Sequence, residues 1–477
     1  MTHTVEKIGG TSMSRFTEVL NNILLRKKNG SLFNRIFVVS AYSGVTDLLL
    51  EHKKTGDAGV YSCFAEAEEE DAWIDQLAKV KTKLLEINEL MFTGDDLSAA
   101  NTFISARIAD TERCMKNLHN LCSYGHFQLE EHLSTIREML ASIGEAHSAY
   151  NTVKLLQQNE LPARFVDLTG WKQEQSLPVD EMIKHHLLPL DPSKELLIVT
   201  GYTHCEEQLM RTFDRGYSEM TFAKIAALTN AREAVIHKEF HLSSADPKLV
   251  GEENVVTIGM TNFDVADQLS NLGMEAIHPR AAREIRKSGI PIRIKNTFEP
   301  EHLGTVIDNN YCNPRPCVEI ITGRNDAVGI EIFDQEMLGS PDYDIYISKL
   351  MKELKISIVN KDADANSITF YAVSTRKKIN RVMRLIEQQY PSAEVSMHKI
   401  AIISAVGSDI KVKGILAKTI SALSNADINI LALHQSVRQV EMQCIVEQSD
   451  YEKGIKALHV ALIEEENHGD VIRKIAV

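Results

Sequence analysis

The chain has 477 residues, of which 44% are hydrophobic and 25% charged, and its formal net charge is −14. This acidic balance argues against a general nucleic-acid-binding protein, which needs clustered Lys and Arg to hold phosphates. Seven cysteines without a CxxC pair argue against a zinc ribbon or disulfide framework, and no apolar run approaches the ~18 residues of a membrane span, so we expect a cytoplasmic protein.

The first half of the chain reads as an α/β domain. Three short apolar strands, Thr4–Ile8, Arg35–Val39 and Leu196–Thr200, each end in a turn of small residues, and helical patterns follow the first two. Strands that alternate with helices predict a mostly parallel sheet with helices on both faces. Ligands bind outside the carboxyl ends of such strands, where all three turns lie. Between residues 65 and 143 the pattern changes to long helices, which predicts a helical insertion, and the acidic run Glu66–Asp71 is expected to form a solvated face of it.

The last third has a different rhythm, and irregular chain near Glu299–Pro316 marks the boundary. Two copies of a split βαβ unit follow. In the first copy we expect strands at Val318–Ile321, Ile356–Val359, Ser367–Val373 and Ala393–Met397, with helices at Asp342–Leu354 and Lys377–Gln389. In the second copy we expect strands at Lys399–Val406, Ile428–His434 and Glu441–Glu447, helices at Lys413–Asn425 and Asp450–Ile463, and a further strand at Val471–Ala476.

The segment KIGGTS, residues 7–12, has the features of an anion site. Gly9 and Gly10 let backbone N–H groups approach an anion closely, the following helix N-terminus adds positive potential, and Lys7 adds a full charge. Such a site suits phosphoryl transfer, which depends on positioning and charge stabilisation. The alternative is that the two glycines form only a turn. The Walker A pattern is absent from the sequence.

This motif and several others resemble the aspartate kinase family in their order and spacing. They are KIGGTS, VVSAYSGVT at 38–46, GE at 144–145, TG at 200–201, DP at 246–247, IHP at 277–279, IPIRI at 290–294, GT at 304–305, and a C-terminal stretch from AIISAVGSDIKVKG to LALHQS. The opening HTVEKIGGTSMS further resembles aspartate kinases encoded with ectoine-synthesis genes. The resemblance implies an amino acid kinase domain over residues 1–305 and two ferredoxin-like βαββαβ ACT domains over 316–397 and 398–477.

The resemblance also implies roles for individual residues. Those implied for ATP and its phosphates are Lys7, Gly9, Gly10, Ser12, Ser218, Glu219 and Lys238, and those implied for aspartate are Ser40, Thr46 and Glu145. Lys7 would stabilise the charge on the transferred phosphoryl group, and Mg²⁺ would arrive with ATP. Without the family pattern, Glu145 would be read as a surface residue of a helix.

Three positions depart from the family pattern. Thr169 stands where the family has an Arg that grips a substrate carboxylate, and Arg164 or Arg211 is a possible replacement. Glu275 stands where the family has a Lys near the nucleotide phosphates, which a carboxylate would repel. The third is Lys238, in a segment that replaces a Trp-Thr-Asp sequence. It either supplies the missing charge or is a surface lysine.

The tandem ACT region implies regulation by an amino acid, with threonine or lysine as the family's effectors. The positions that match the ligand-contacting loops are Ser408, Asp409, Ile428 and Asn429. The alternative is that the repeats only hold together a homodimer or higher homo-oligomer.

These observations predict ATP-dependent phosphorylation of the side-chain carboxylate of L-aspartate, which is the first step of aspartate-family amino acid or ectoine biosynthesis. Two alternatives stay open at this point. One is an amino-acid sensor whose kinase domain has lost catalysis, which the departures at Thr169 and Glu275 suggest. The other is a kinase of the same fold that acts on another acidic amino acid, such as glutamate.

Overall fold

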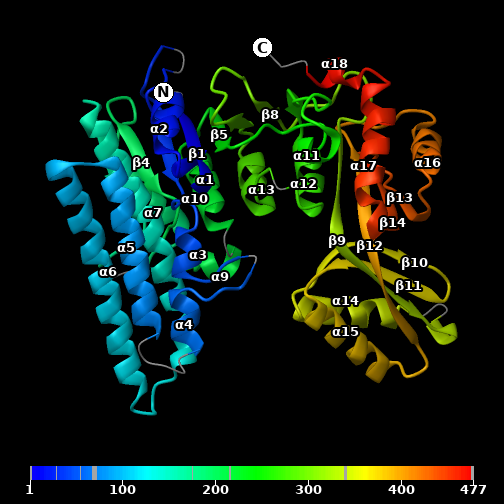
Figure 1. Cartoon of the computed structure of the whole chain (residues 1–477), viewed down its shortest axis with the longest axis horizontal. Coiled ribbons are helices and arrows are strands. Elements are labelled where there is room, and N and C mark those ends of the chain that lie inside the picture. Colours follow the sequence, from blue (N-terminus) through cyan, green and yellow to red (C-terminus); the bar gives the residue numbers. More distant parts are fainter. Residues whose placement is uncertain are drawn as a thin grey trace. The chain divides into compact units, whose positions relative to one another are not determined.

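The computed structural model describes residues 3–27, 30–53, 55–66, 72–173, 176–213, 216–274, 276–337 and 341–473. The chain forms two compact units (Figure 1). The first comprises residues 1–241 and 277–309, and the second comprises residues 242–276 and 310–477. The boundary predicted near residue 305 thus lies close to the end of the first unit, whereas residues 242–276 pack with the second.

The first unit is built on a mostly parallel sheet whose strands follow the order β3-β4-β2-β1-β5-β7-β8. These strands are Thr4–Ile8 (β1), Arg35–Val39 (β2), Ala163–Val166 (β3), Leu196–Thr200 (β4), Glu233–Lys238 (β5), Ile292–Asn296 (β7) and Thr305–Ile307 (β8). Every residue of β1, β2 and β4 is buried, because helices cover both faces of a parallel sheet. The predicted bounds of these three strands are confirmed.

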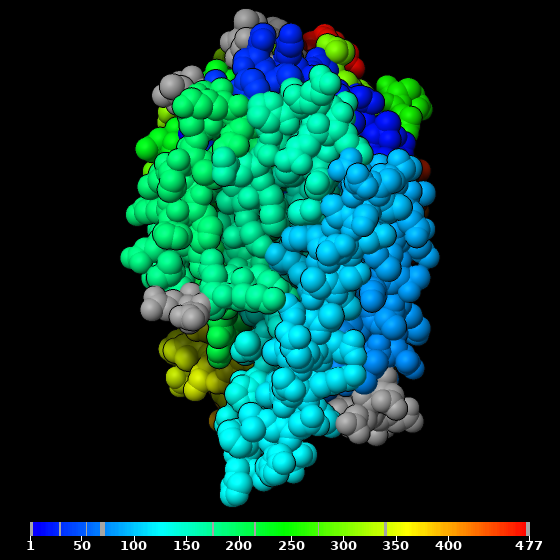
Figure 2. Space-filling view, turned by 90° about the vertical axis from the view of Figure 1, so that its left-hand side faces the viewer, coloured from blue at the N-terminus to red at the C-terminus, as the bar shows by residue number. Residues whose placement is uncertain are grey.

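Helices of very different lengths surround this sheet. They are Gly10–Met13 (α1), Phe16–Val19 (α2), Val45–Leu49 (α3), Val60–Glu66 (α4), Ala72–Met91 (α5), Gly94–Cys122 (α6), Leu133–Gln158 (α7), Val179–Leu187 (α8), Leu209–Phe213 (α9), Tyr217–Leu228 (α10) and Pro279–Lys287 (α13), with a π-helical turn at Leu20–Leu24. The predicted helical insertion consists of α4 to α7 (Figure 1), and the end of α6 and the loop to α7 form a narrow tip (Figure 2). The acidic run predicted to form its solvated face, residues 66–71, lies outside the described residues except for Glu66.

The register of the parallel strands places the predicted turns next to one another along the same edge of the sheet. Ile8 is paired with Val39 on one side and with His237 on the other, and Val39 is paired with Thr200. The residues that follow these positions therefore lie side by side where the strands end: Gly9, Ser40, Gly201 and Lys238. This edge is the place where an open α/β sheet binds its ligands.

The second unit contains a six-stranded sheet with the order β10-β11-β9-β12-β14-β13. Its strands are Ile320–Phe333 (β9), Ser357–Ala363 (β10), Ser367–Val373 (β11), Glu394–Val406 (β12), Ile430–Gln435 (β13) and Glu441–Glu447 (β14). The other elements of this unit are Pro247–Val250 (α11), Met260–Thr261 (β6), Phe263–Asn271 (α12), Asp342–Glu353 (α14), Arg376–Gln389 (α15), Ile415–Asn425 (α16), Tyr451–His459 (α17), a π-helical turn at Val460–Glu464, and His468–Ile472 (α18). Both βαββα copies are present.

Three predictions for the second unit are wrong in detail. The strand predicted at Val318–Ile321 is the much longer β9, Ile320–Phe333. The strands predicted at Ala393–Met397 and Lys399–Val406 are one strand, β12, which pairs with β9 along both copies and so joins them into one sheet. The strand predicted at Val471–Ala476 begins inside a helix, α18, and residues 474–477 lie outside the described residues. A short apolar run does not distinguish strand from helix by periodicity.

In the described part of the chain, no helix is both long enough and apolar enough to cross a membrane.

Candidate active site

Two lysines and a carboxylate meet at the carboxyl edge of the first unit's sheet. Nζ of Lys7, near the end of β1, lies 3.1 Å from Oε1 of Glu219, in the first turn of α10. Oε2 of Glu219 accepts a hydrogen bond from the backbone N–H of His278 (2.5 Å). Burial alone would raise the pKa of Glu219, but the charges of Lys7 and Lys238 and the His278 amide lower it below its usual range. The charges of both lysines thus act on this carboxylate.

The turn after β1 brings bare backbone to this edge. A Cβ atom on Gly10 would lie 2.6 Å from the carbonyl oxygen of Ala41, so the approach of these two turns requires glycine. Gly9 is the N-cap of the short helix α1, and its N–H donates to the carbonyl of His237 (3.4 Å). Ser12, by contrast, is fully buried, and its hydroxyl hydrogen bonds with Glu239 and Thr297, each at 3.1 Å.

A second carboxylate, Glu145 of α7, lies beside this cluster. It is 1% exposed and accepts a hydrogen bond from Oγ of Ser218 at 2.6 Å. Its other oxygen is buried without a hydrogen-bond partner of good geometry among the described residues. Burial raises the pKa of Glu145 to about 8, although Ser218 and the charge of Lys7 act in the opposite direction. In the described part of the site, this buried carboxylate forms no ion pair.

The close approach around Glu145 depends on a second glycine. A Cβ on Gly201, directly after β4, would lie 2.9 Å from Oε2 of Glu145 and 3.0 Å from Cβ of Ser218. Any side chain at this position would displace one of the two. The TG pair at residues 200–201 thus has a physical role in letting α7 and α10 meet at the sheet edge.

The loop after β2 packs against α7 and carries the other residues predicted to hold aspartate. The carbonyl of Ser40 accepts a hydrogen bond from Ser148 (2.8 Å), and Ala41 fills the space above Gly144, one residue before Glu145. Thr46 is half-buried in the first turn of α3. The fold thus holds this loop against the helix that carries Glu145.

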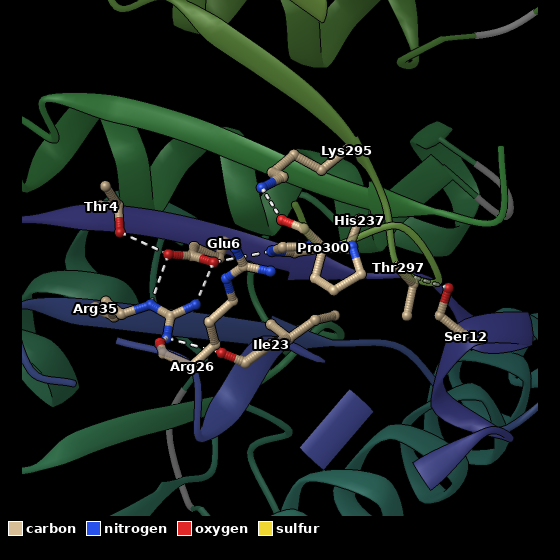
Figure 3. A network of polar contacts seen from close by, with 10 residues as sticks. All are labelled: Thr4, Glu6, Ser12, Ile23, Arg26, Arg35, His237, Lys295, Thr297 and Pro300. Carbon is tan, nitrogen blue, oxygen red and sulfur yellow. Dashed lines mark hydrogen bonds and ion pairs between the residues drawn. The ribbon is translucent and has the colours of Figure 1, made fainter. Parts of the chain in front are cut away.

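Behind the edge, a buried ionic network joins the three central strands (Figure 3). Both carboxylate oxygens of Glu6 on β1 bond to the guanidinium of Arg35 on β2, each at 2.8 Å, and Oε2 also bonds to Nε2 of His237 on β5 at 2.8 Å. Burial would raise the pKa of Glu6, but Arg35 and then His237 hold it well below its usual range. Because side chains alternate along a strand, the network lies on the sheet face opposite Lys7. It fixes the strands that present Lys7 and Lys238.

At the first departure from the family pattern, the structure supplies an arginine from elsewhere in the sequence. Arg107 of α6 is buried, and its guanidinium donates to Asp167 and to Oγ1 of Thr169 (3.1 Å). Neither arginine proposed from the sequence contacts this segment in the described structure: Arg164 pairs with Glu195 at 2.6 Å, and Arg211 lies against Gln208. Sequence reasoning missed Arg107, which is 60 residues away and has no local motif. Glu275, the second departure, lies outside the described residues.

The residues predicted to hold an effector lie in the second unit and do not share one environment. Ser408 is buried, and its hydroxyl donates to the buried carboxylate of Glu319 at 2.5 Å. Asp409 accepts a hydrogen bond from Lys411 N–H. Ile428 is part of the hydrophobic core beneath β12 and β14, whereas Asn429 is exposed.

Comparisons with known proteins agree with this architecture. The model of the amino acid kinase family matches residues 3–296, and an ACT domain model matches residues 403–462. The E. coli aspartokinase III structure in complex with lysine and aspartate superposes with a TM-score of 0.74 at 18% identity, covering 97% of this chain and 99% of that one. The structure of the Clostridium acetobutylicum aspartate kinase gives 0.68 at 22% identity, covering 97% and 99%. At these identities the two structures establish the fold.

Sequence relatives are more specific. The chain is 64% identical over 472 residues to "Aspartate kinase Ask_Ect" of Stutzerimonas stutzeri (strain A1501), covering 98% of this chain and 99% of that protein. It is 25% identical over 485 residues to the chloroplastic aspartokinase 2 of Arabidopsis thaliana, covering 96% and 84%. The chain belongs to the amino acid kinase family and, within it, to the aspartate kinases.

Proposed function

We propose that the chain transfers the γ-phosphoryl group of ATP to the side-chain carboxylate of L-aspartate, giving ADP and 4-phospho-L-aspartate. The observation that carries this proposal is the pairing of charges at one sheet edge. Among the described residues Glu145 is a buried carboxylate that forms no ion pair, and it lies beside Lys7, whose charge acts together with that of Lys238 on Glu219. Aspartate offers an ammonium group to Glu145, and phosphates offer negative charge to the lysines.

In this proposal Glu145 accepts hydrogen bonds from the α-ammonium group of aspartate. A charge-assisted bond of this kind replaces the hydration that burial removed from the carboxylate. Ser40 and Thr46, on the loop packed against α7, are the donors proposed for the aspartate carboxylates. Ser218 holds Glu145 in place through its 2.6 Å hydrogen bond.

The phosphates of ATP would bind where β1 and β5 end. Gly9 and Gly10 leave room for an anion to approach the backbone, and the Gly10 N–H and the ammonium groups of Lys7 and Lys238 provide the positive potential. Glu219 positions Lys7 through the 3.1 Å ion pair. Mg²⁺ would arrive with ATP and be held mainly by the phosphates, because it keeps most of its ligands as water and phosphate oxygens in such sites.

The reaction needs no general base, since the side chain of aspartate is already ionised at neutral pH. A carboxylate oxygen attacks the γ-phosphorus in line, the bond to the bridging oxygen of ATP breaks, and ADP leaves. Lys7 stabilises the charge on the transferred group, and the rigid strand edge holds the two reactants in alignment.

The direct test is ATP turnover with L-aspartate in the presence of hydroxylamine, which traps the acyl phosphate as a hydroxamate. We expect hydroxamate with aspartate but not with L-glutamate or without an amino acid. Product with glutamate alone would identify another acidic substrate. Binding of ATP or an amino acid without any product would identify a sensor that has lost catalysis.

The ACT copies of the second unit give the proposal a regulatory part. We propose that an amino acid, with threonine or lysine as the first candidates, binds this unit near Ser408 and Asn429, and that the enzyme is a homo-oligomer. Adding each amino acid to the hydroxamate assay tests regulation, and sedimentation tests assembly. Unchanged turnover with both amino acids would leave the copies with an assembly role only.

A further inference from the structure

The first unit contains a cavity of about 590 Å³ that the proposed reaction does not use. It is lined by α6, α7 and the segments that follow β3 and β4. Its volume falls in the range of small-molecule sites, which is roughly 300–1,000 Å³. The residues assigned above to ATP and aspartate do not line it.

The residues that line the cavity include Glu138 of α7, whose carboxylate is buried (5% exposed). It accepts hydrogen bonds from the hydroxyl of Tyr202 (2.5 Å) and the backbone N–H of Arg211 (3.2 Å). Among the described residues it forms no ion pair, and the adjacent Arg137 is engaged by Glu51 at 2.6 Å. Burial raises the pKa of the Glu138 carboxyl. A buried acidic group that forms no direct ion pair among the described residues thus faces an open volume.

The other charged residues that line the cavity do not neutralise the negative charge of Glu138. Lys172 and Arg113 are both engaged by Asp110, the former at 2.8 Å. Burial lowers the pKa of His204, which favours its neutral form. The lining contains three carboxylates, those of Asp110, Glu138 and the exposed Glu206, and two cations, those of Arg113 and Lys172. The net charge of the described lining is therefore negative.

The cavity also offers apolar surface next to this carboxylate. The ring of Trp171 lines it, and the guanidinium of Arg107 lies 4.9 Å from the centre of that ring. Met139 and Cys114 add sulfur-containing side chains on α7 and α6. A ligand that fits must therefore combine a cationic group with an apolar or aromatic body.

We propose that this cavity is a second small-molecule site that binds an organic ammonium ion, with the ammonium group on Glu138 and the apolar body against Trp171. Glu138 precedes Glu145 by seven residues of α7, which corresponds to roughly 10 Å along the helix axis. The cavity is therefore close to the aspartate site, and its lining includes Thr169, at the position where the family pattern has an Arg that grips a substrate carboxylate. Its occupancy does not depend on phosphoryl transfer.

The experiment is calorimetric titration of the full chain with benzylamine at neutral pH, where the amine is cationic. Benzyl alcohol and benzoate serve as the neutral and anionic matches. We expect saturable binding of benzylamine only. Glu138→Gln should weaken it at least about tenfold, as expected for a hydrogen bond to a charged group. The matched control is Glu112→Gln, which removes a carboxylate of α6 that pairs with Lys116 and does not line the cavity.

Two further variants keep the test decisive if Glu138→Gln fails to fold. Cys114→Trp fills the cavity from its exposed side and should abolish binding, whereas Glu145→Gln should leave it unchanged. Absence of saturable benzylamine binding, equal binding to the wild type and Glu138→Gln, or loss of binding in Glu145→Gln would overturn the proposal. Since no arm requires turnover, failure here is distinguishable from failure of the hydroxamate assay.

Discussion

Each unit of this protein contains a buried glutamate that accepts a hydrogen bond from a serine hydroxyl. In the first unit Ser218 donates to Glu145 at 2.6 Å, and in the second Ser408 donates to Glu319 at 2.5 Å. Burial raises the pKa of both carboxyls. By residue type, burial and local geometry the two pairs are alike.

They differ in how many of their other hydrogen-bonding positions are filled. Glu319 also accepts from the backbone N–H of Ser408 (3.2 Å) and from Thr261 (3.3 Å), and the Ser408 hydroxyl itself accepts from Asn313 N–H (2.9 Å). Among the described residues, Glu145 keeps a buried oxygen without a partner of good geometry, and the charge of Lys7 acts on it. Within this pair, an unfilled oxygen beside the charge of Lys7, rather than burial alone, therefore distinguishes the proposed substrate-binding carboxylate from the structural one.

The largest effect is expected at Lys7. Replacing it with alanine removes the cation nearest the transferred phosphoryl group, and we expect kcat to fall about 10³-fold or more. Circular dichroism and thermal melting should show a folded protein. The matched control is Lys154→Ala, whose ion pair with Asp96 (3.6 Å) lies on the helical insertion. A kcat for Lys7→Ala within a few-fold of the wild type would contradict the role.

The second-largest effect is expected at Glu145, whose ionisation should make kcat/KM for aspartate depend on pH. In the free enzyme its pKa is raised to about 8, so below that pH the carboxyl must lose a proton before it can hold the ammonium group. We expect kcat/KM for aspartate to rise with pH through about 8 and then level off. Glu145→Gln should raise KM about 10- to 100-fold and abolish this limb. An unchanged limb in Glu145→Gln would assign the titration to another group.

The sequence pattern predicted the bounds of a strand correctly where those bounds depend on residues close together in the sequence. The strands β1, β2, β4, β11 and β14 begin and end at the predicted residues. The strand β12 was split in the prediction because polar residues around His398 interrupt its apolar pattern, although pairing with β9 continues through them. Hydrogen bonding between distant segments overrode the local signal.

The site shows the same limit. The motifs indicated Lys7, Glu145 and Glu219 individually, but their distances depend on strand register and on the glycine at residue 201. Arg107 was not predictable, because its contact with Asp167 and Thr169 joins segments 60 residues apart without a motif on either. A long-range contact of this kind depends on how α6 packs, which residue spacing does not encode.

A smaller effect is expected at Lys238. Its charge acts on Glu219 together with that of Lys7, so it adds to the positive potential without being the nearest cation. We expect Lys238→Ala to raise KM for ATP about tenfold, which corresponds to about 1.4 kcal/mol, and to change KM for aspartate little. Steady-state kinetics with each substrate varied in turn measures both. Equal increases in the two KM values would indicate a general disturbance of the sheet edge.

The smallest effect is expected at Glu319 of the second unit, the carboxylate that accepts several hydrogen bonds. Ser408→Ala removes the shortest hydrogen bond to Glu319, and we expect the unfolding free energy to fall by about 1–3 kcal/mol, the usual cost of an unsatisfied buried group. Urea denaturation of this variant and of Ser421→Ala, an exposed serine on α16, measures the difference. Equal midpoints for the two variants would mean that Glu319 is satisfied without Ser408. The Ser408 hydroxyl would then be available to a ligand, and the contrast between the two carboxylates would be smaller than their contacts imply.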